Sequence, residues 1–427
     1  MKVAIVGYGI EGRVNYDYYH RAGHDVTIVD ERDELSDLPK QAPVILGVGA
    51  LQKLNGFDLI IRTPGIAPQK IVTDGKMWSA TNEFFARCTT PIIGVTGSKG
   101  KGTTCSFITE ILRAAGKKVE LVGNIGRPAL AVLDEANAAD IVVYELSSFQ
   151  LWDSQYSPHV GVVLHIEPDH LDVHRSFEDY LEAKANIVRY MKSDDTAIVH
   201  PTNVHAHTIA SYCPAEVRHY QDASDGLAYV DGSFFYRNGQ AICSVAAVTL
   251  PGAHNLDNAC AAIAAVAKFD VSDMAIEKGL AGFTGLPHRL KFVRELEEVR
   301  YYDDSIATTP GSAIAALRAF TEPKVLILGG SGKGADYQEL VEEITRHAVR
   351  KLILVGRESE RIERALHDSD VPYVRLGMTT MSEIVEESHD AAQPGDVVIL
   401  SPAAASFDMF NSYSDRGDQF IAAVNEL

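Results

Sequence analysis

Long apolar runs are missing from this chain of 427 residues. No stretch approaches the ~18 apolar residues that a membrane-spanning helix needs. The apolar start at residues 3–6 is interrupted by glycines and charged residues from Gly7 onward, before the apolar region of a signal peptide can form. The sequence therefore predicts a protein without a leader or a membrane segment, located in the cytoplasm.

Basic residues and paired cysteines are also scarce. Asp and Glu outnumber Lys and Arg by 58 to 39, for a formal net charge of -19, which argues against a surface for nucleic acid or for an anionic membrane. The five cysteines are widely spaced and form no C-x-x-C pair. Neither a disulfide framework nor a zinc site is indicated, and a reducing compartment is expected.

What is present is a rhythm of short apolar runs and helix-length segments, which is typical of β-α-β units around a parallel sheet. The runs lie at residues 3–6, 26–29, 59–61, 92–95, 141–144, 160–164, 325–328, 352–355 and 397–400. Residues 227–250 break this rhythm with two hairpin signals, Asp231-Gly232 and Asn238-Gly239. Glycine and proline residues interrupt the pattern near residues 90 and 286. They predict an α/β chain of three domains, at 1–90, 91–286 and 287–427.

A glycine-rich loop follows the predicted strand at 91–95 and precedes a helical segment that ends near Gly116. The loop residues are Gly97, Ser98, Lys99, Gly100, Lys101, Gly102, Thr103 and Thr104. Such a loop wraps a phosphate with backbone N–H groups, while a lysine and a hydroxyl meet the outer phosphates and Mg²⁺. Lys101 and Thr103 are the candidates for these two roles. Val95 and Gly102 depart from the strict pattern, and the alternative is a plain surface turn.

Acidic and imidazole side chains follow two other predicted strands at their carboxyl ends, where parallel sheets bind ligands. Glu145 follows the strand at 141–144, and the strand at 160–164 leads into a loop with His165, His170 and His174. These groups could converge on one Mg²⁺ site, or the loop could be a solvated surface. By pattern alone, Lys184 in the helical segment 177–191 is a surface lysine.

The first predicted strand runs into Gly7, Gly9 and Gly12, and Asp30 closes the second. This pattern is typical of a dinucleotide-binding domain, as in a nicotinamide dehydrogenase or a nucleotide sensor. It suits equally a Rossmann-like domain for the diphosphate and uridine of a sugar nucleotide, with residues 63–65 as a further turn. The dehydrogenase interpretation gives no role to the second glycine-rich loop, at residues 97–104.

Taken together, these segments resemble the Mur ligase family of peptidoglycan synthesis in all three regions of the chain. The motifs are residues 96–104, Glu145, Asp169-His170-Leu171-Asp172, Ala183-Lys184, residues 254–258 and residues 285–289. The resemblance implies a Rossmann-like domain for a UDP-linked precursor, a central P-loop ATPase-like parallel-sheet domain, and a C-terminal Rossmann-like domain for the amino acid. It also implies ATP and Mg²⁺ as cofactors and a Lys184 that CO₂ carbamylates.

The same resemblance assigns site residues. Those implied to be catalytic are Lys101, Glu145, His170 and Lys184, and Thr103 joins the last three as a metal ligand. Those implied to bind ATP are the glycine-rich loop with Asn255, Asn258, Arg289 and Asp304. Those implied to contact the UDP precursor are Gly9, Ile10, Glu11, Asp30, Glu31, Arg32, Thr63, Gly65, Asn124, Ser147 and Gln150. Those implied to receive the amino acid are His170, Thr308, Lys333, Ser406 and Tyr413. The plainer alternatives are that Asn255 caps a helix at 256–268 and that His288 is a linker residue.

Within the family, residues 145–151, 329–334 and 401–406 resemble the member that adds D-glutamate to UDP-N-acetylmuramoyl-L-alanine through an acyl phosphate. The chain contains no Asp-Asn-Pro-Arg sequence of the kind expected in the relative that adds a diamino acid. Gly102, Glu11 and Ile306 depart from that member's pattern. L-Glutamate as the added amino acid, or a ligase similar to folylpolyglutamate synthase, are the alternatives. The expected partners are the two substrates, with no nucleic acid and no membrane, and the expected state is a monomer.

Overall fold

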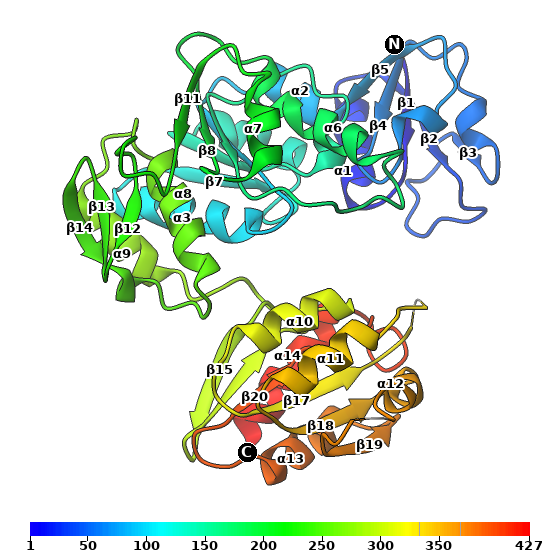
Figure 1. The fold of residues 1–427 in the computed structure, drawn as a ribbon. Helices are drawn as coiled ribbons and strands as arrows, with labels where there is room; N and C mark the ends of the chain where they lie inside the picture. The colour runs from blue at the N-terminus through cyan, green and yellow to red at the C-terminus, as the bar shows by residue number, and fades with distance from the viewer. Residues whose placement is uncertain (333, 368) are drawn as a thin grey trace. The chain divides into compact units, whose positions relative to one another are not determined.

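The computed structural model describes residues 1–332, 334–367 and 369–427, which divide into two units (Figure 1). Unit 1 comprises Met1–Val248 and Leu256–Phe283, and unit 2 comprises Thr249–Asn255 and Thr284–Leu427. Unit 1 holds two parallel sheets and a small antiparallel one, and unit 2 holds one larger sheet. The predicted α/β class is confirmed, while the three domain boundaries expected from the sequence stay a prediction.

The first sheet has the strand order β3-β2-β1-β4-β5, all parallel. Its elements are β1 Lys2–Val6, α1 Ile10–Arg21, β2 Asp25–Asp30, β3 Val44–Leu46, β4 Leu59–Arg62, β5 Lys76–Ser79 and α2 Ala80–Arg87. Successive residues of β1 enter two different apolar clusters, Val3 and Ile5 in one and Ala4 and Val6 in the other. The strand is buried on both faces because side chains alternate along it. This is the strand order of a Rossmann-like domain.

The second sheet has the order β11-β10-β9-β6-β8-β7, again parallel. Its strands are β6 Ile92–Thr96, β7 Val119–Gly123, β8 Ile141–Glu145, β9 Val160–Val163, β10 Thr196–Val199 and β11 Glu216–His219. Its helices are α3 Lys101–Ala114, α4 Leu133–Asn137, α5 Ser148–Leu151, α6 Phe177–Arg189 and α7 Val204–Ala210. Because β6 lies between β8 and β9, the loops that follow these three strands emerge side by side at one edge.

A small antiparallel sheet completes unit 1 together with two helices. Its strands are β12 Tyr229–Asp231, β13 Phe234–Arg237 and β14 Gln240–Ser244, and the helices are α8 His254–Ala265 and α9 Asp273–Gly282. Both predicted hairpin turns are present, and Gly232 and Asn238 have the positive φ that such turns require. The helix expected at 256–268 begins two residues earlier and ends three residues earlier.

Unit 2 is built on the strand order β15-β16-β20-β17-β18-β19, in which only β15 is antiparallel to its neighbour. Its strands are β15 Lys291–Leu296, β16 Val299–Asp303, β17 Lys324–Gly329, β18 Val349–Val355, β19 Tyr373–Gly377 and β20 Val397–Leu400. Its helices are α10 Pro310–Arg318, α11 Gln338–Arg346, α12 Ser359–Ala365, α13 Met381–Ala391 and α14 Tyr413–Glu426. One apolar cluster includes α10, α11 and α12, and the other includes α13 and α14. Helices therefore cover both faces.

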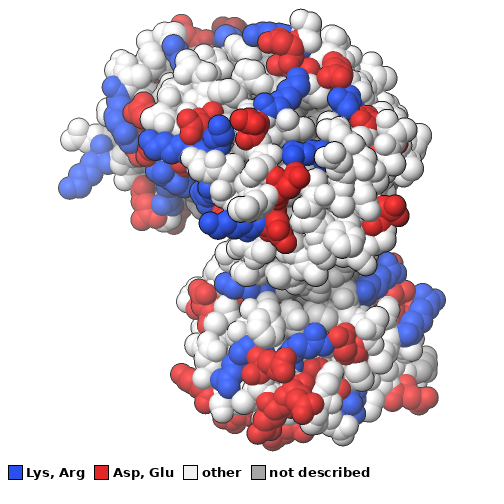
Figure 2. Space-filling model, turned by 90° about the vertical axis from the view of Figure 1, so that its left-hand side faces the viewer, with Lys and Arg blue, Asp and Glu red and all other residues white. Residues whose placement is uncertain are grey.

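The surface and the thiols agree with the composition. Among the described residues, no helix is both long enough and apolar enough to cross a membrane. Lys and Arg are interspersed with Asp and Glu on the face that Figure 2 shows. All five cysteines are free, and burial raises the pKa of each thiol.

Candidate active site

Close contacts of the backbone join the carboxyl ends of β1 and β4 in unit 1. Gly7 has a φ of +92°, and a Cβ there would stand 2.2 Å from Thr63 Oγ1. A Cβ on Gly12 would stand 2.0 Å from the carbonyl oxygen of Gly7, so no larger residue fits at either position. At Gly9, the N-cap of α1, a Cβ would meet nothing within 4 Å. The N-terminus of α1 is thus open to an anion such as a diphosphate.

Asp30, at the end of β2, already has partners in the protein. Its Oδ2 accepts from the backbone N–H of Tyr8 (2.8 Å) and from Arg32 Nη2 (2.7 Å), and its Oδ1 accepts from Arg32 Nε (2.9 Å). Burial alone would raise the pKa of Asp30, but these hydrogen bonds lower it to about 2. Asp30 is therefore an ionised anchor for Arg32. The predicted neighbour Glu31 pairs with Lys70 at 3.5 Å.

Two more predicted precursor contacts occupy the first turn of α1. Ile10 is exposed, and Glu11 is only partly accessible to solvent. Burial raises the pKa of the Glu11 carboxyl to about 7, and the nearby Arg62 opposes this shift. A neutral Glu11 repels an anionic ligand less than an ionised one, which makes an acidic residue at this helix N-terminus compatible with diphosphate binding.

The phosphate loop follows β6 as the sequence predicts, and α3 begins at Lys101. Gly100 has a φ of +83°, and a Cβ there would stand 2.3 Å from Asn258 Oδ1. Thr104 Oγ1 donates to the same amide oxygen at 3.4 Å. Lys101 Nζ donates to the carbonyl oxygens of Gly97 (2.9 Å) and Ser98 (3.0 Å). The loop therefore brings Lys101 and Asn258 to the N-terminus of α3.

The rest of the loop is fixed by the segment that follows β9. Ser98 Oγ donates to the carbonyl oxygen of Glu167 (2.8 Å) and accepts from its N–H (2.9 Å), and Lys99 Nζ pairs with Glu167 Oε1 at 2.7 Å. Gly102 and Thr103 are buried in the first turn of α3. The Thr103 hydroxyl is placed on the helix that the phosphate loop starts, which suits its predicted metal role.

Lys184 lies beside this loop and is only 1% exposed. Its Nζ donates to the Gly97 carbonyl oxygen (2.9 Å) and to Thr96 Oγ1 (3.2 Å). The interpretation of Lys184 as a surface lysine is therefore wrong, because the apolar face of α6 carries it into the core. Burial lowers the pKa of its amine well below the usual value, and the positive charge of Lys101 lowers it further.

Glu145 ends β8 and is 5% exposed. Its Oε2 accepts from the backbone N–H of Ile125 at 2.9 Å, which draws the loop after β7 toward the site. Asn124 precedes Ile125 in that loop and is exposed. Glu145 is also one of the charges that act on Lys184. Glu145, Lys184 and the phosphate loop thus meet at one edge of the second sheet.

The three histidines after β9 lie in different environments. His165 and His170 expose about half of their side chains, whereas His174 is buried, with Nε2 3.0 Å from Ser148 Oγ and Nδ1 3.4 Å from Asp179 Oδ2. The alternative in which all three converge with Glu145 on one metal ion is not supported for His174, because both of its ring nitrogens lie against protein groups. His170 has a φ of +54° and packs on the Phe149 ring, and its metal role stays a prediction.

The side chains that could hold a metal ion are few. Among the described residues, no group of three or more His, Cys, Asp and Glu side chains could hold a metal ion. Glu145 and His170 are the only two predicted ligands of these types, so a metal ion held by them would need a further donor from another residue type. A carbamate on the buried Lys184 amine would supply it. It would add the kind of oxygen donor that Mg²⁺ prefers.

Ser147 and Gln150 form a capping box at the N-terminus of α5. The Gln150 N–H donates to Ser147 Oγ at 3.2 Å, and Gln150 Oε1 accepts from the backbone N–H of Ser147 at 2.9 Å. Both side chains are buried. Their local bonds fix this turn, so any contact with a precursor would be made by a preformed structure.

A cavity of about 440 Å³ that the sequence did not predict opens at the carboxyl ends of β9 and β10. Its polar lining includes His165, His200 and His205 with the amide of Asn203. The cavity borders the phosphate loop, because the N–H of Ser98 donates to the carbonyl oxygen of His165 at 3.0 Å. Imidazole rings and an amide are groups that stack on and hydrogen-bond to a planar ligand.

In unit 2, a buried polar cluster forms where β16 ends. His288 Nδ1 lies 2.7 Å from Asp303 Oδ2, and a Cβ on Gly417 of α14 would stand 2.1 Å from the same nitrogen. The interpretation of His288 as an ordinary linker residue is therefore wrong. Asp304 accepts from Ser401 Oγ (2.7 Å) and from the N–H of Leu290, and burial raises its pKa to about 7.

The predicted amino-acid contacts follow β16 and β20, which are neighbours in the sheet. Thr308 is partly exposed after β16, Ser406 is buried after β20, and Tyr413 is exposed at the start of α14. The Tyr413 carbonyl oxygen accepts from Ser305 Oγ at 2.8 Å, so this helix start is attached to the β16 loop. Lys333 lies outside the described residues.

Two further residues, Arg289 and Asn255, are predicted to bind the nucleotide. Arg289 is exposed in unit 2. Asn255 is the second residue of α8 and donates from Nδ2 to the Pro251 carbonyl oxygen at 2.7 Å. The alternative in which Asn255 caps the helix is wrong, because the helix begins one residue before it.

Known proteins resemble the chain over its whole length. The Mur ligase middle domain matches residues 95–266, and the Mur ligase glutamate ligase domain matches residues 288–404. UDP-N-acetylmuramoylalanine--D-glutamate ligase of Acetivibrio thermocellus is 37% identical and covers 100% of this chain and 96% of its own. Among solved structures, UDP-N-acetylmuramate-alanine ligase MurC from Thermotoga maritima has a TM-score of 0.63 at 17% identity over 100% of this chain and 99% of its own.

The MurF ligase from Thermotoga maritima, solved in complex with ADP, has a TM-score of 0.58 at 17% identity and covers 100% of this chain and 94% of its own. These two structures share the fold. From the phosphate loop, the sheet order and this whole-length identity, we conclude that the chain belongs to the Mur ligase family.

Proposed function

We propose that this chain joins D-glutamate to UDP-N-acetylmuramoyl-L-alanine with ATP, in the synthesis of a peptidoglycan precursor. The observation that carries the proposal is the relative with this activity in its name, 37% identical over the whole chain. The buried lysine beside a phosphate loop supports it. A nicotinamide dehydrogenase is disfavoured, because Arg32 and the Tyr8 N–H already occupy the Asp30 oxygens that a ribose would need.

In the proposed reaction, the alanyl carboxylate attacks the γ-phosphate of ATP and forms an acyl phosphate and ADP. The amine of D-glutamate then attacks the activated carbonyl carbon, and phosphate leaves. Lys101, at the start of α3, compensates charge on the transferring phosphoryl group. Mg²⁺ held by Thr103, Glu145, His170 and the carbamate of Lys184 would supply further charge compensation on the phosphoryl oxygens.

The remaining roles in the proposal follow the sequence. The region of Gly9, Ile10, Glu11 and Thr63 takes the diphosphate and uridine, since a Cβ on Gly9 at the N-terminus of α1 would meet nothing within 4 Å. Those assigned to the amino acid are His170, Thr308, Lys333, Ser406 and Tyr413, and those assigned to the nucleotide are Asn255, Asn258, Arg289 and Asp304. A monomer in the reducing cytoplasm completes the proposal, and five free thiols support that compartment.

The test is an assay of the purified full chain with ATP, Mg²⁺, bicarbonate and UDP-N-acetylmuramoyl-L-alanine. D-Glutamate, L-glutamate and meso-diaminopimelate are offered separately, and products are read by mass together with released phosphate. We expect product with D-glutamate alone. Product with L-glutamate alone would overturn the stereochemistry. Product only with a folate acceptor and L-glutamate would overturn the acceptor.

A further inference from the structure

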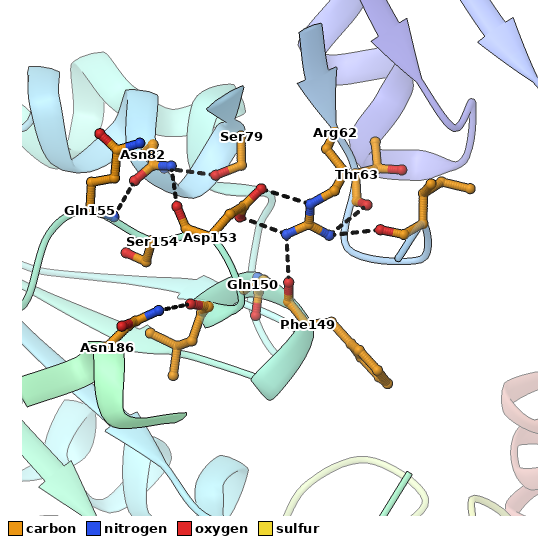
Figure 3. Close-up of polar contacts among 12 residues, drawn as sticks. Arg62, Thr63, Ser79, Asn82, Phe149, Gln150, Asp153, Ser154, Gln155 and Asn186 are labelled. Carbon is orange, nitrogen blue, oxygen red and sulfur yellow. Dashed lines mark hydrogen bonds and ion pairs between the residues drawn. The ribbon is translucent and has the colours of Figure 1, made fainter. Parts of the chain in front are cut away.

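Arg62 is a fully buried arginine that the reaction does not use. It ends β4 in the first sheet and is 1% exposed. Sequence reasoning passed over it, although a charged residue at the end of an apolar strand is a signal of a specific partner. Figure 3 shows its guanidinium pointing away from the first sheet toward the segment after β8.

All five N–H donors of this guanidinium are used by protein acceptors. Nε donates to Asp153 Oδ2 (2.8 Å), and Nη2 donates to Asp153 Oδ1 (2.7 Å) and to the Phe149 carbonyl oxygen (2.8 Å). Nη1 donates to the carbonyl oxygens of Thr63 (3.2 Å) and Ile66 (2.9 Å). An arginine carries five such donors, so none remains for a substrate phosphate. Arg62 therefore holds protein and not ligand.

The acceptors belong to two different parts of the proposed precursor site. The carbonyl oxygens of Thr63 and Ile66 flank the turn after β4, which is proposed to contact the nucleotide end. Phe149 lies in α5, the turn of Ser147 and Gln150, which is proposed to contact the muramoyl-alanine end. A single guanidinium thus fixes both turns relative to each other (Figure 3).

Two asparagines support the same segment from other sides. Asn82, in the first turn of α2, donates from Nδ2 to the Asp153 carbonyl oxygen (2.9 Å) and accepts at Oδ1 from the N–H of Gln155 (2.8 Å). Asn186 of α6 donates to the carbonyl oxygen of Leu151 at 2.8 Å. The segment at 149–155 is therefore held by β4, α2 and α6, and α6 also carries Lys184.

We propose that Arg62 is a positioning residue that sets the distance between the two ends of the acceptor site, with Asp153 as its partner. The proposal rests on the proposed function. A precursor that spans both turns binds well only if they are held at the right separation, because a preformed site costs less ordering free energy. ATP and glutamate do not span these turns, so their binding is independent of Arg62.

The first test measures steady-state constants for Arg62→Lys, Asp153→Asn and a matched control, Arg218→Lys. Lysine keeps the charge and loses the planar fork of donors. Arg218 is a partly buried arginine of unit 1 that binds groups close to it in sequence, those of Asp225 (2.6 and 2.8 Å) and the Glu216 carboxylate (3.5 Å). We expect the KM for the precursor to rise about tenfold or more in Arg62→Lys, which is roughly 1.4 kcal/mol. The KM values for ATP and glutamate should stay within about twofold, as should all three values in the control.

A merely structural role would lower the active fraction and leave all three KM values unchanged, and that result would overturn the proposal. Hydrogen–deuterium exchange on the same full-length variants gives a second readout that needs no substrate. We expect faster exchange in both 63–66 and 149–155 in Arg62→Lys, with unchanged exchange in 97–104. Faster exchange in neither segment, or in only one, would overturn the coupling. If exchange becomes faster in both segments of Arg62→Lys but the wild-type protein does not use the precursor, only the proposed substrate is overturned.

Discussion

Lys184 illustrates how burial changes the chemistry of a single side chain. A lysine amine reacts with CO₂ only in its neutral form, and burial beside Lys101 lowers the pKa of Lys184 so that this form is available. The carbamate would be an anion in place of a neutral amine, next to Glu145. The charge balance of the site would then depend on the modification of one residue.

We predict that Lys184→Ala lowers turnover by at least about two orders of magnitude, because a metal-holding oxygen donor is lost. Short carboxylic acids added to the variant should restore part of the activity, and removal of CO₂ should inactivate the wild type reversibly. The measurement is phosphate release with and without bicarbonate. Lys192→Ala, at an exposed position just after α6, is the control and should behave as wild type. Full activity of both proteins in CO₂-free buffer would contradict the carbamate.

Asp304 makes stability depend on pH. Its pKa is raised by burial from 3.8 to about 7, so the folded protein holds the proton more tightly than the unfolded chain. The free energy of unfolding should therefore be highest below pH 3.8 as far as this group is concerned, fall as the pH rises from 3.8 to about 7, and level off above it. The fall is at most roughly 4 kcal/mol, since one pKa unit corresponds to about 1.4 kcal/mol.

Asp304→Asn should remove this part of the pH dependence. The measurement is denaturant unfolding of the full chain at several pH values, followed on the transition of unit 2. Asp390→Asn, at an exposed position of α13, should leave the profile unchanged. If Asp304→Asn and the wild type had parallel profiles, Asp304 would titrate normally and its proposed protonation would be wrong.

At the scale of elements, the junction between β7 and β8 depends on the absence of a side chain. Gly123 has a φ of +117°, and a Cβ there would stand 2.3 Å from the Glu145 carbonyl oxygen. Gly116 also has a positive φ, of +79°, but a Cβ there would meet nothing within 4 Å. Substitution of Gly116 would therefore report the cost of a positive φ alone, and substitution of Gly123 the cost of a positive φ together with a steric clash.

We predict that Gly123→Ala costs about 2 kcal/mol or more of stability and lowers activity, because the loop of Ile125 moves away from Glu145. Gly116→Ala should cost about 1 kcal/mol and leave activity unchanged. Thermal unfolding and phosphate release measure the two effects. Equal costs for both substitutions would show that φ alone decides, and the close approach to Glu145 would then have no energetic role.

The strands and the positions of their ends are the features that the sequence predicts best. Apolar runs predict the strands, and strand ends predict that Lys101 and Glu145 lie at one edge, since loops after parallel strands share that edge. Periodicity could not identify Lys184 as buried, because a helix face that is apolar around a lysine is also compatible with a partly exposed side chain. Arg62 and the His288–Asp303 pair were missed because their partners lie far away in sequence or in a neighbouring turn.

At the scale of the whole molecule, unit 2 has the features of an independent folding unit. Its sheet has helices on both faces and an apolar cluster under each layer. We predict that residues 284–427 fold alone, because a chain of this length buries enough apolar surface for a cooperative core. Circular dichroism during heating should give one cooperative transition. A gradual loss of signal would indicate that the unit depends on the rest of the chain.

The state of the five thiols has a practical consequence for observing the molecule at work. Maleimide and iodoacetamide dyes react with the thiolate, and burial raises the pKa of every native cysteine and so keeps its thiolate population small. A cysteine introduced at an exposed site in each unit would therefore be labelled far faster than the native five. Single-molecule fluorescence transfer between two such dyes could then follow the separation of the units through the catalytic cycle in an otherwise unaltered chain.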